Sequence, residues 1–133
     1  MTSEFVHLHN HSDYSLLDGA QRVDQLVNTI GDLNMDSVAL TEHGNMFSVV
    51  PYYKAAKKAK IKPIIGCEVY VAVGSRFEKK TTQEHGWGNN HLVLLVQNKT
   101  GYKNLMKLVT AGYLEGFYYR PRIDMEMLAE FSE

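Results

Sequence analysis

Strand-like and helix-like stretches alternate along this chain, and their order limits the possible folds more than any other feature. Residues 5–10 alternate between two faces, which predicts a short strand. Apolar residues recur at helical spacing over residues 20–34, and SVALT at 37–41 predicts a second strand. A helix is expected over about 46–60 and a third strand over 62–73. This order favours right-handed βαβ units with a parallel sheet.

The second half of the chain continues the pattern after a longer irregular segment. Residues 74–90 are long for a connection within a compact domain, and such loops often carry function. HLVLLVQ at 91–97 predicts a fourth strand. A helix over about 100–114, with Thr100 as its N-cap, and a last helix from about Asp124 complete the expected elements. The fold class is therefore α/β, with parallel strands and flanking helices.

Composition excludes several classes of protein. The 133 residues are 44% hydrophobic and 22% charged, with a formal net charge of −1, as in an ordinary globular domain. The first residues lack a basic flank followed by an apolar stretch, so no secretory signal is expected, and no apolar run approaches the roughly 20 residues that span a bilayer. A single cysteine rules out an internal disulfide and fits a reducing cytoplasm. With charges nearly balanced, any nucleic-acid binding has to be local.

Imidazoles and carboxylates occur at the ends of the predicted strands. Since the carboxyl ends of parallel strands meet at one edge, we expect most of these side chains to converge there. They are His9, His11, Asp18, His43, Glu68 and, at the start of the fourth strand, His91. Imidazole and carboxylate together suit zinc, manganese or iron. Such ions activate water and polarise phosphoryl oxygens, so the pattern predicts metal-assisted hydrolysis of a phosphoester.

Neighbouring polar residues have other interpretations. His85 stands alone in the long loop and receives no role. Glu42 is left outside the ligand set because it could pair with a lysine instead. Cys67 alternates to the strand face opposite Glu68, which favours a packed thiol. An aromatic and basic cluster could stack on bases or pack against another domain; its members are Tyr118, Tyr119, Arg120 and Arg122.

Several longer motifs carry a family resemblance. HLHNHSDYSLLDG, TEHGN, IKPIIGCEVYV and HLVLLVQNKTGYKNL resemble the successive motifs of a PHP (polymerase and histidinol phosphatase) domain. With TGYKNLMKLV and YLEGFYYRPRID added, the chain is similar to the amino-terminal PHP domain of the bacterial DNA polymerase III alpha-subunit family, the C-family replicative polymerases. The resemblance extends from about Phe5 to the end of the chain.

The resemblance implies a fold and a site. Residues 1–133 would form the N-terminal part of a distorted (β/α)7 TIM-like barrel, with later strands, further ligands and the polymerase core beyond Glu133. The family pattern assigns catalytic and metal-binding roles to His9, His11, Asp18, His43 and Glu68, and a further metal ligand to His91. His7 stands where many members carry an aspartate, so it is expected to support the ligands. Zinc is the expected metal, with manganese or iron as alternatives and two or three ions in the complete domain.

Three functions follow as hypotheses. In the first, the full-length protein is a DNA-directed DNA polymerase whose PHP site is a metal-dependent phosphoesterase with 3′–5′ exonuclease activity. Its partners would be DNA and other polymerase III holoenzyme subunits in the cytoplasm, with no membrane. In the second, the domain is a metal-stabilised scaffold that docks polymerase domains or a proofreading subunit. The third, a free-standing phosphatase of the histidinol-phosphate type, is disfavoured by TGYKNL and FYYRPRID.

Overall fold

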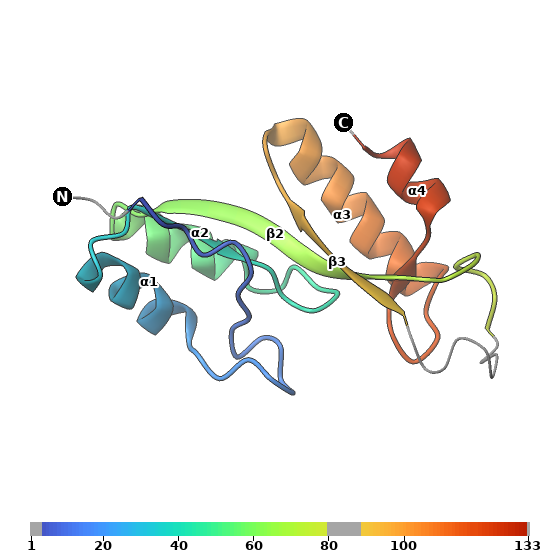
Figure 1. The fold of residues 1–133 in the computed structure, drawn as a ribbon, viewed down its shortest axis with the longest axis horizontal. Helices are drawn as coiled ribbons and strands as arrows, with labels where there is room; N and C mark the ends of the chain where they lie inside the picture. Colours follow the sequence, from blue (N-terminus) through green and yellow to red (C-terminus); the bar gives the residue numbers. More distant parts are fainter. Residues whose placement is uncertain (1–3, 80–88, 133) are drawn as a thin grey trace.

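The computed structural model describes residues 4–79 and 89–132, which form a mixed α/β structure (Figure 1). The elements in chain order are α1 (Val23–Asp32), β1 (Ser37–Leu40), α2 (Val49–Lys58), β2 (Lys62–Val71), β3 (Asn90–Leu95), α3 (Lys99–Leu114), β4 (Arg122–Ile123) and α4 (Met125–Glu130). No helix within these two ranges is both long enough and apolar enough to cross a bilayer.

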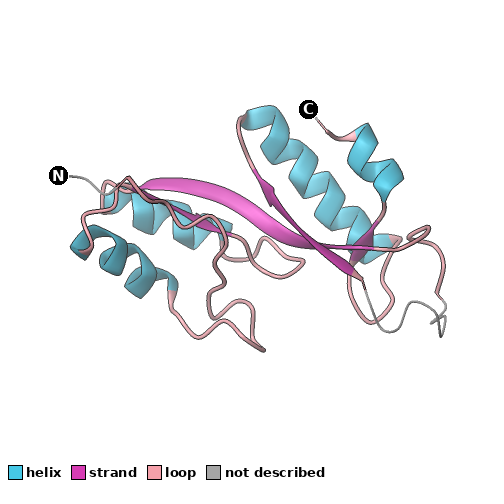
Figure 2. Cartoon of the chain, in the orientation of Figure 1, coloured by secondary structure: helices cyan, strands magenta, loops and turns pink. Residues whose placement is uncertain are grey.

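Strand β2 is the central element, and it runs through both halves of the molecule (Figure 2). Strand β1 pairs in parallel with its first half, from Ser37 opposite Lys62 onward. Strand β3 pairs with its second half in the antiparallel direction, and β4 pairs in parallel with its last residues. A single long strand therefore carries two groups of helices.

Gly66 lies at the point where β2 changes from one group of neighbours to the next. A β-carbon at this position would meet the carbonyl oxygen of Leu94 at 2.5 Å and Cγ2 of Thr41 at 2.8 Å. Backbone and side chains thus approach from both sides, and only glycine leaves room for them. This close approach brings β3 alongside Glu68, two residues further on.

Each half has its own apolar core. In the first half, α1 and α2 cover β1 through buried residues that include Val27, Ile30, Val38 and Tyr52. In the second half, alternate residues of β2 face α3 and α4; the cluster includes Cys67, Val69, Val71, Leu105 and Met127. The prediction of a packed thiol at Cys67 is confirmed, since this side chain is fully buried and burial raises its pKa to about 12.

The α/β class is confirmed, but the prediction that the fourth strand is parallel is wrong. Strand β3 runs antiparallel to β2, with Glu68 opposite Val93 and Tyr70 opposite His91. Apolar periodicity identifies a strand but does not give its direction, which depends on the connection that precedes it. The described residues do not form a closed barrel, so the (β/α)7 barrel stays a prediction.

The prediction of a strand at residues 5–10 is also wrong, although this segment does run beside β1. Residues 5–10 run beside β1, where Ala39 N–H donates to the His7 carbonyl at 2.8 Å and Thr41 N–H donates to the Asn10 carbonyl at 2.9 Å. Between these two bonds, side-chain hydrogen bonds replace the backbone hydrogen bonds of a regular sheet. The Asn10 N–H donates to Oγ1 of Thr41, and its side-chain amide donates to the Ala39 carbonyl. The segment therefore follows β1 without forming a regular strand.

Helix boundaries differ from the predicted ones by a few residues. Helix α3 begins at Lys99, because the Asn98 side chain accepts a hydrogen bond from Gly101 N–H and acts as the N-cap in place of Thr100. Helix α2 buries Val49, Tyr52 and Ala56, whereas Val50 and Tyr53 are exposed. The Tyr52 hydroxyl donates to a β1 carbonyl, which explains why this ring points inward.

Candidate metal centre

Glu68 lies at the centre of the site, on the face of β2 opposite the second core. Beyond the end of β1, the chain continues in register along β2: Glu68 N–H donates to the Glu42 carbonyl at 3.0 Å, and Gly44 N–H donates to the Glu68 carbonyl at 2.8 Å. His43 is thereby placed opposite Glu68. Only 5% of the Glu68 side chain is exposed, so its carboxylate is held in a largely dry environment.

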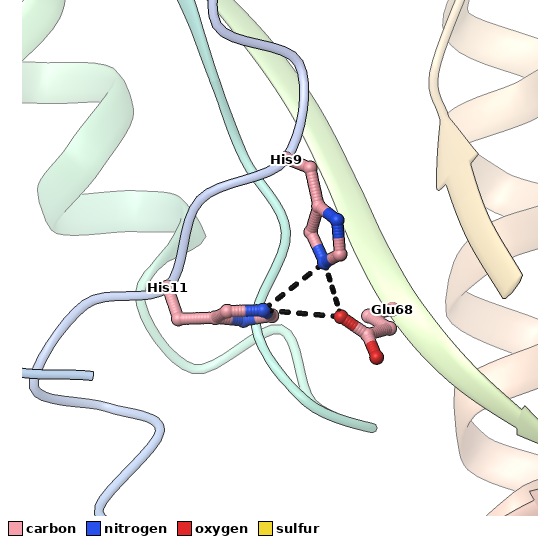
Figure 3. A group of neighbouring side chains, drawn as sticks. All are labelled: His9, His11 and Glu68. Atoms are coloured by element: carbon pink, nitrogen blue, oxygen red, sulfur yellow. Dashed lines mark hydrogen bonds and ion pairs between the residues drawn. The ribbon is translucent and has the colours of Figure 1, made fainter. Parts of the chain in front are cut away.

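One carboxylate oxygen of Glu68 faces His9 and His11, which are two residues apart in the sequence (Figure 3). Nε2 of His9 contacts Oε2 of Glu68, and Nε2 of His11 lies 3.0 Å from the same oxygen. The two imidazole nitrogens are 3.1 Å apart. Three potential ligand atoms therefore converge on one point, close enough to share a metal ion.

The other oxygen of Glu68 faces a second pair of histidines. Nδ1 of His91 contacts Oε1 of Glu68, and Nδ1 of His43 lies 3.5 Å from it. These three side chains form a second group of potential ligand atoms. The rings of His11 and His43 are stacked, with centroids 4.0 Å apart and an interplanar angle of 8°. The two groups are therefore adjacent, and Glu68 belongs to both.

Asp18 lies beside this arrangement and belongs to neither group. Its Oδ2 accepts a hydrogen bond from Nε2 of His43 at 2.7 Å. That bond lowers the pKa of Asp18, which therefore stays ionised at neutral pH. The ring of His7 contacts Phe5 edge-on, with centroids 4.8 Å apart. A direct ligand role for Asp18 and a supporting role for His7 both stay predictions.

Protonation in this cluster suits a cation. Burial, followed by the nearby His43, lowers the pKa of His11 and favours the neutral ring. Burial alone would raise the pKa of Glu68, but hydrogen bonds from His9 and His91 outweigh it and the net pKa is lowered. A neutral imidazole and an ionised carboxylate are the forms that bind metals.

Two buried ring nitrogens provide a test of fit. Nδ1 of His11 and Nδ1 of His43 have no hydrogen-bond partner among the described residues. Unpartnered buried nitrogens are costly in a protein interior, and His43 turns this atom toward Glu68. Since His11 faces Glu68 through Nε2, the unpartnered Nδ1 of His43 is the atom that bears on the site. Together with the nitrogen and oxygen donor set, it fits divalent zinc, manganese or iron.

Glu42 supports the site without joining it. It is only 1% exposed, and the hydroxyls of Ser12 and Ser15 donate to its two oxygens. Serines rather than a lysine are thus its partners. Oγ of Ser15 in turn accepts from the backbone N–H of His43 at 3.1 Å. This buried carboxylate therefore ties the loop that carries Asp18 to the segment that carries His43.

One aromatic neighbour of the histidines is not singled out by any of the sequence motifs. Tyr70 stacks near His43 at 6.1 Å between centroids and meets His91 edge-on at 4.8 Å. Its position two residues after Glu68 places it on the same strand face, which was a usable indication. His91 reaches the site because β3 is antiparallel, so that the first residues of β3 lie beside the last residues of β2.

The aromatic and basic cluster of 118–122 divides into two parts. Arg122 is buried, donates to the backbone carbonyls of Gly116 and Glu78, and lies 5.3 Å from the ring centre of Tyr118. These two residues are structural. Tyr119 and Arg120 instead line a pocket beside the histidines. His85, to which no role was given, lies outside the described residues.

Comparison with known protein families identifies the family of this chain. The family model of the PHP domain matches residues 7–133. The chain therefore belongs to the PHP domain family, as its motifs had indicated.

The similarity extends to one kind of PHP protein in particular. The chain is 54% identical to DNA polymerase III subunit alpha of Borreliella burgdorferi over 98% of its own length and 11% of that relative. It is 48% identical to the subunit of the same name from Aquifex aeolicus, over 100% of the chain and 12% of the relative. In Treponema pallidum the identity is 50% over 97% of the chain and 11% of the relative. The chain thus spans about a tenth of the length of these relatives.

One solved structure supports the fold alone. An amidohydrolase from Chromobacterium violaceum, solved with bound sulfate and no metal, superimposes with a TM-score of 0.52 at 22% identity. The match covers 80% of this chain and 34% of the amidohydrolase.

Proposed function

We propose that this chain is the amino-terminal PHP region of a DNA polymerase III alpha subunit, and that its histidine–Glu68 centre hydrolyses phosphodiesters with divalent cations. The substrate would be a DNA 3′ end, and the activity a 3′–5′ exonuclease. The whole protein would then be a DNA-directed DNA polymerase that replicates DNA in the cytoplasm with other holoenzyme subunits. The identity to alpha subunits over nearly the entire chain supports this proposal.

The shared carboxylate of Glu68 carries the hydrolytic part of the proposal. His9 and His11 would hold one cation against its Oε2, while His43 and His91 would hold another against Oε1. When bound, such ions lower the pKa of a water and polarise a phosphoryl oxygen, and a pair of them stabilises both the attacking and the leaving oxygen. Zinc fits the nitrogen-rich donor set best, with manganese and iron as alternatives.

The chain's own residues would fix the geometry of this chemistry. Nε2 of His43 keeps its proton on the side of Asp18, which leaves Nδ1 for the cation. Further strands would complete the (β/α)7 barrel and supply any third ion site. Leu92 and Leu95 support this completion, because they are 41% and 40% exposed on β3, whose outer edge has no partner strand among the described residues.

A nuclease assay tests this function in the full-length protein, of which this chain would be the amino-terminal part. The polymerase active site is disabled, and removal of nucleotides from a 3′-labelled DNA is followed with zinc, manganese or iron. We expect His9→Ala to reduce both the exonuclease rate and the bound metal, since it removes one donor of the first group. Asp24→Asn, an exposed carboxylate change in α1, is the control and should leave both unchanged. Wild-type rate and metal content in His9→Ala would refute the proposal.

A scaffold is the second candidate, and the origin of the ligands favours it. The histidines come from segments that belong to both halves of the molecule, so that a bound cation would tie these halves together. In that case, chelation would lower the melting temperature, and the intact protein would show no nuclease activity with any of the three metals. The free-standing phosphatase is disfavoured by the 54% identity to a polymerase subunit.

A further inference from the structure

A pocket of about 450 Å³ opens directly beside the second group of histidines. Asp18, His43 and His91 form part of its wall. Five aromatic rings and one cation form a large part of the rest, namely Tyr14, Tyr70, Tyr113, Phe117, Tyr119 and Arg120. The wall is completed by Ser15, Leu16, Leu17, Asn45 and Pro121. The candidate metal centre therefore continues into an aromatic pocket.

Four of these rings are exposed, and three of them belong to residues 113–119. Tyr113 is 41%, Phe117 47% and Tyr119 65% exposed. The rings of Tyr113 and Phe117 stack at 6.1 Å with an interplanar angle of 25°. Neither cluster of buried core residues includes any of the three. Grouped exposed rings of this kind mark a binding surface.

A cation accompanies the rings. The guanidinium of Arg120 lies 5.6 Å from the ring centre of Tyr70, which is itself only 7% exposed. Aromatic faces combined with a positive charge are the usual composition of surfaces that bind single-stranded nucleic acid, because every base can stack on a ring. This combination of rings and charge suits a nucleotide.

Tyr119 is held in an unfavourable backbone conformation. Its φ is +58°, in a turn that Tyr118 N–H closes by donating to the Arg120 carbonyl at 3.1 Å. Glycine adopts this region readily, whereas bulky side chains seldom do. Strained residues of this kind concentrate at functional sites. The turn therefore holds an aromatic side chain at the pocket, although its backbone conformation would be less strained with glycine.

We propose that this pocket binds the base of the nucleotide whose phosphodiester lies at the histidine–Glu68 centre. The base would stack on Tyr119 and the neighbouring rings, with Arg120 beside the sugar–phosphate. The pocket shares His43 and His91 with the second ligand group, so base and phosphate of one nucleotide occupy adjoining spaces. The inference rests on the proposed function and defines its substrate as a DNA 3′ terminus with an unstacked base.

Binding measurements test the inference apart from catalysis. The zinc-loaded full-length protein is titrated by calorimetry with 2′-deoxyadenosine 5′-monophosphate and, separately, with 2-deoxyribose 5-phosphate, which lacks the base. We expect the nucleotide to bind at least about tenfold more tightly, as stacking on aromatic side chains provides. A short oligodeoxyadenylate with a free 3′ hydroxyl should bind at least as tightly as the mononucleotide.

Variants at one position separate binding from folding. Tyr119→Gly removes the ring and relieves the strain of the positive φ, so the melting temperature should stay the same or rise. The ratio of the affinity for the nucleotide to the affinity for 2-deoxyribose 5-phosphate should fall to near one. Tyr119→Phe keeps the stacking face and should keep the preference. Tyr53→Ala, which removes a similarly exposed tyrosine outside the pocket, is the matched control.

The outcomes that overturn the inference are distinct. Equal affinity for the two probes, or an unchanged preference in Tyr119→Gly, would show that no base is bound by this ring. A lower melting temperature in Tyr119→Gly without nucleotide binding in the wild type would mean that the ring packs against another part of the protein. Binding of the mononucleotide but not of the oligonucleotide would exclude a DNA end. If the wild type hydrolyses no phosphodiester, the proposed function fails, while the calorimetric preference still decides this inference.

Discussion

Nε2 of His43 donates a hydrogen bond to the Asp18 carboxylate at 2.7 Å, and Nδ1 of the same ring lies 3.5 Å from Glu68. A histidine that binds a metal through one nitrogen commonly donates through the other to a carboxylate, which fixes the tautomer and the orientation of the ring. In the proposed metal centre, Asp18 would therefore fix the ring of His43 in the orientation and tautomer that suit a cation at Glu68.

Replacing this carboxylate should weaken metal binding without abolishing it. We expect Asp18→Asn to lower the zinc affinity by about 10–100-fold, the usual effect of removing a partner behind a ligand. Competition with a chromogenic chelator measures the affinity. Asp13→Asn, an exposed change in the same loop, should leave it unaltered. An unchanged affinity in Asp18→Asn would show that this hydrogen bond does not contribute.

Glu68→Gln should have the largest effect on metal content. Glu68 provides an oxygen to each group of histidines, so its neutral amide weakens both at once. Elemental analysis after gel filtration should find less than half of the wild-type zinc. Glu130→Gln, at the exposed end of α4, is the control. Full zinc occupancy in Glu68→Gln would be inconsistent with a shared carboxylate.

Two glycine substitutions are expected to have opposite effects on the stability of the protein. In Gly66→Ala the added methyl meets the Leu94 carbonyl at 2.5 Å, and the cost should be about 1–3 kcal/mol of unfolding free energy. In Gly31→Ala, within α1, the added methyl has no heavy atom within 4 Å. This change should stabilise the protein by about 0.5–1 kcal/mol. Urea denaturation measures both, and a neutral Gly66→Ala would contradict the close approach.

Local patterns predicted much of the fold because each element has a strong periodicity of its own. The inward face of α1 and the buried run of β1 follow from residues such as Val27 and Val38. The direction of β3 did not follow, since it depends on long-range pairing with β2. The strand expected at residues 5–10 was lost because the side chains of Asn10 and Thr41 replace the backbone bonds. The apolar periodicity of a sequence does not indicate where side chains will replace backbone hydrogen bonds in this way.

The members of the candidate site were predicted more completely than their roles. His9, His11, His43 and Glu68 converge because the segments that carry the histidines run beside β1 and β2, although residues 5–10 form no regular strand and Glu68 lies within β2. His91 was harder to place, since its position depends on an antiparallel pairing that its motif does not reveal. The division of the 118–122 cluster depends on the burial of Arg122 against distant carbonyls, which spacing does not show.

Asp124 provides a prediction for pH dependence away from the metal centre. It accepts hydrogen bonds from Met127 N–H at 3.1 Å, from Arg76 N–H at 3.0 Å and from the Arg76 guanidinium. Burial would raise the pKa of Asp124, but these bonds outweigh it and lower the pKa below the usual 3.8. A carboxyl whose folded pKa is lowered contributes stability above its unfolded pKa and loses it as the pH falls through the folded value.

Asp124→Asn should therefore destabilise the protein in a pH-dependent way. Asparagine still caps α4. The loss of about 1–3 kcal/mol of unfolding free energy at pH 7 therefore reflects the missing carboxylate charge opposite the Arg76 guanidinium. The difference from wild type should be constant at pH 6–7 and shrink as the pH falls below 3.8. Urea denaturation at pH 7 and at pH values below 3.8 checks this. A difference that stays constant to the lowest pH would contradict the assigned charge interaction.

Anomalous X-ray diffraction at the zinc edge, from crystals of the full chain grown with zinc, tests the central claim most directly. We predict an anomalous peak on each side of the Glu68 carboxylate, one near His9 and His11 and the other near His43 and His91. No peak beside Glu68, with zinc bound elsewhere or not at all, would contradict the assignment of these side chains to a metal centre.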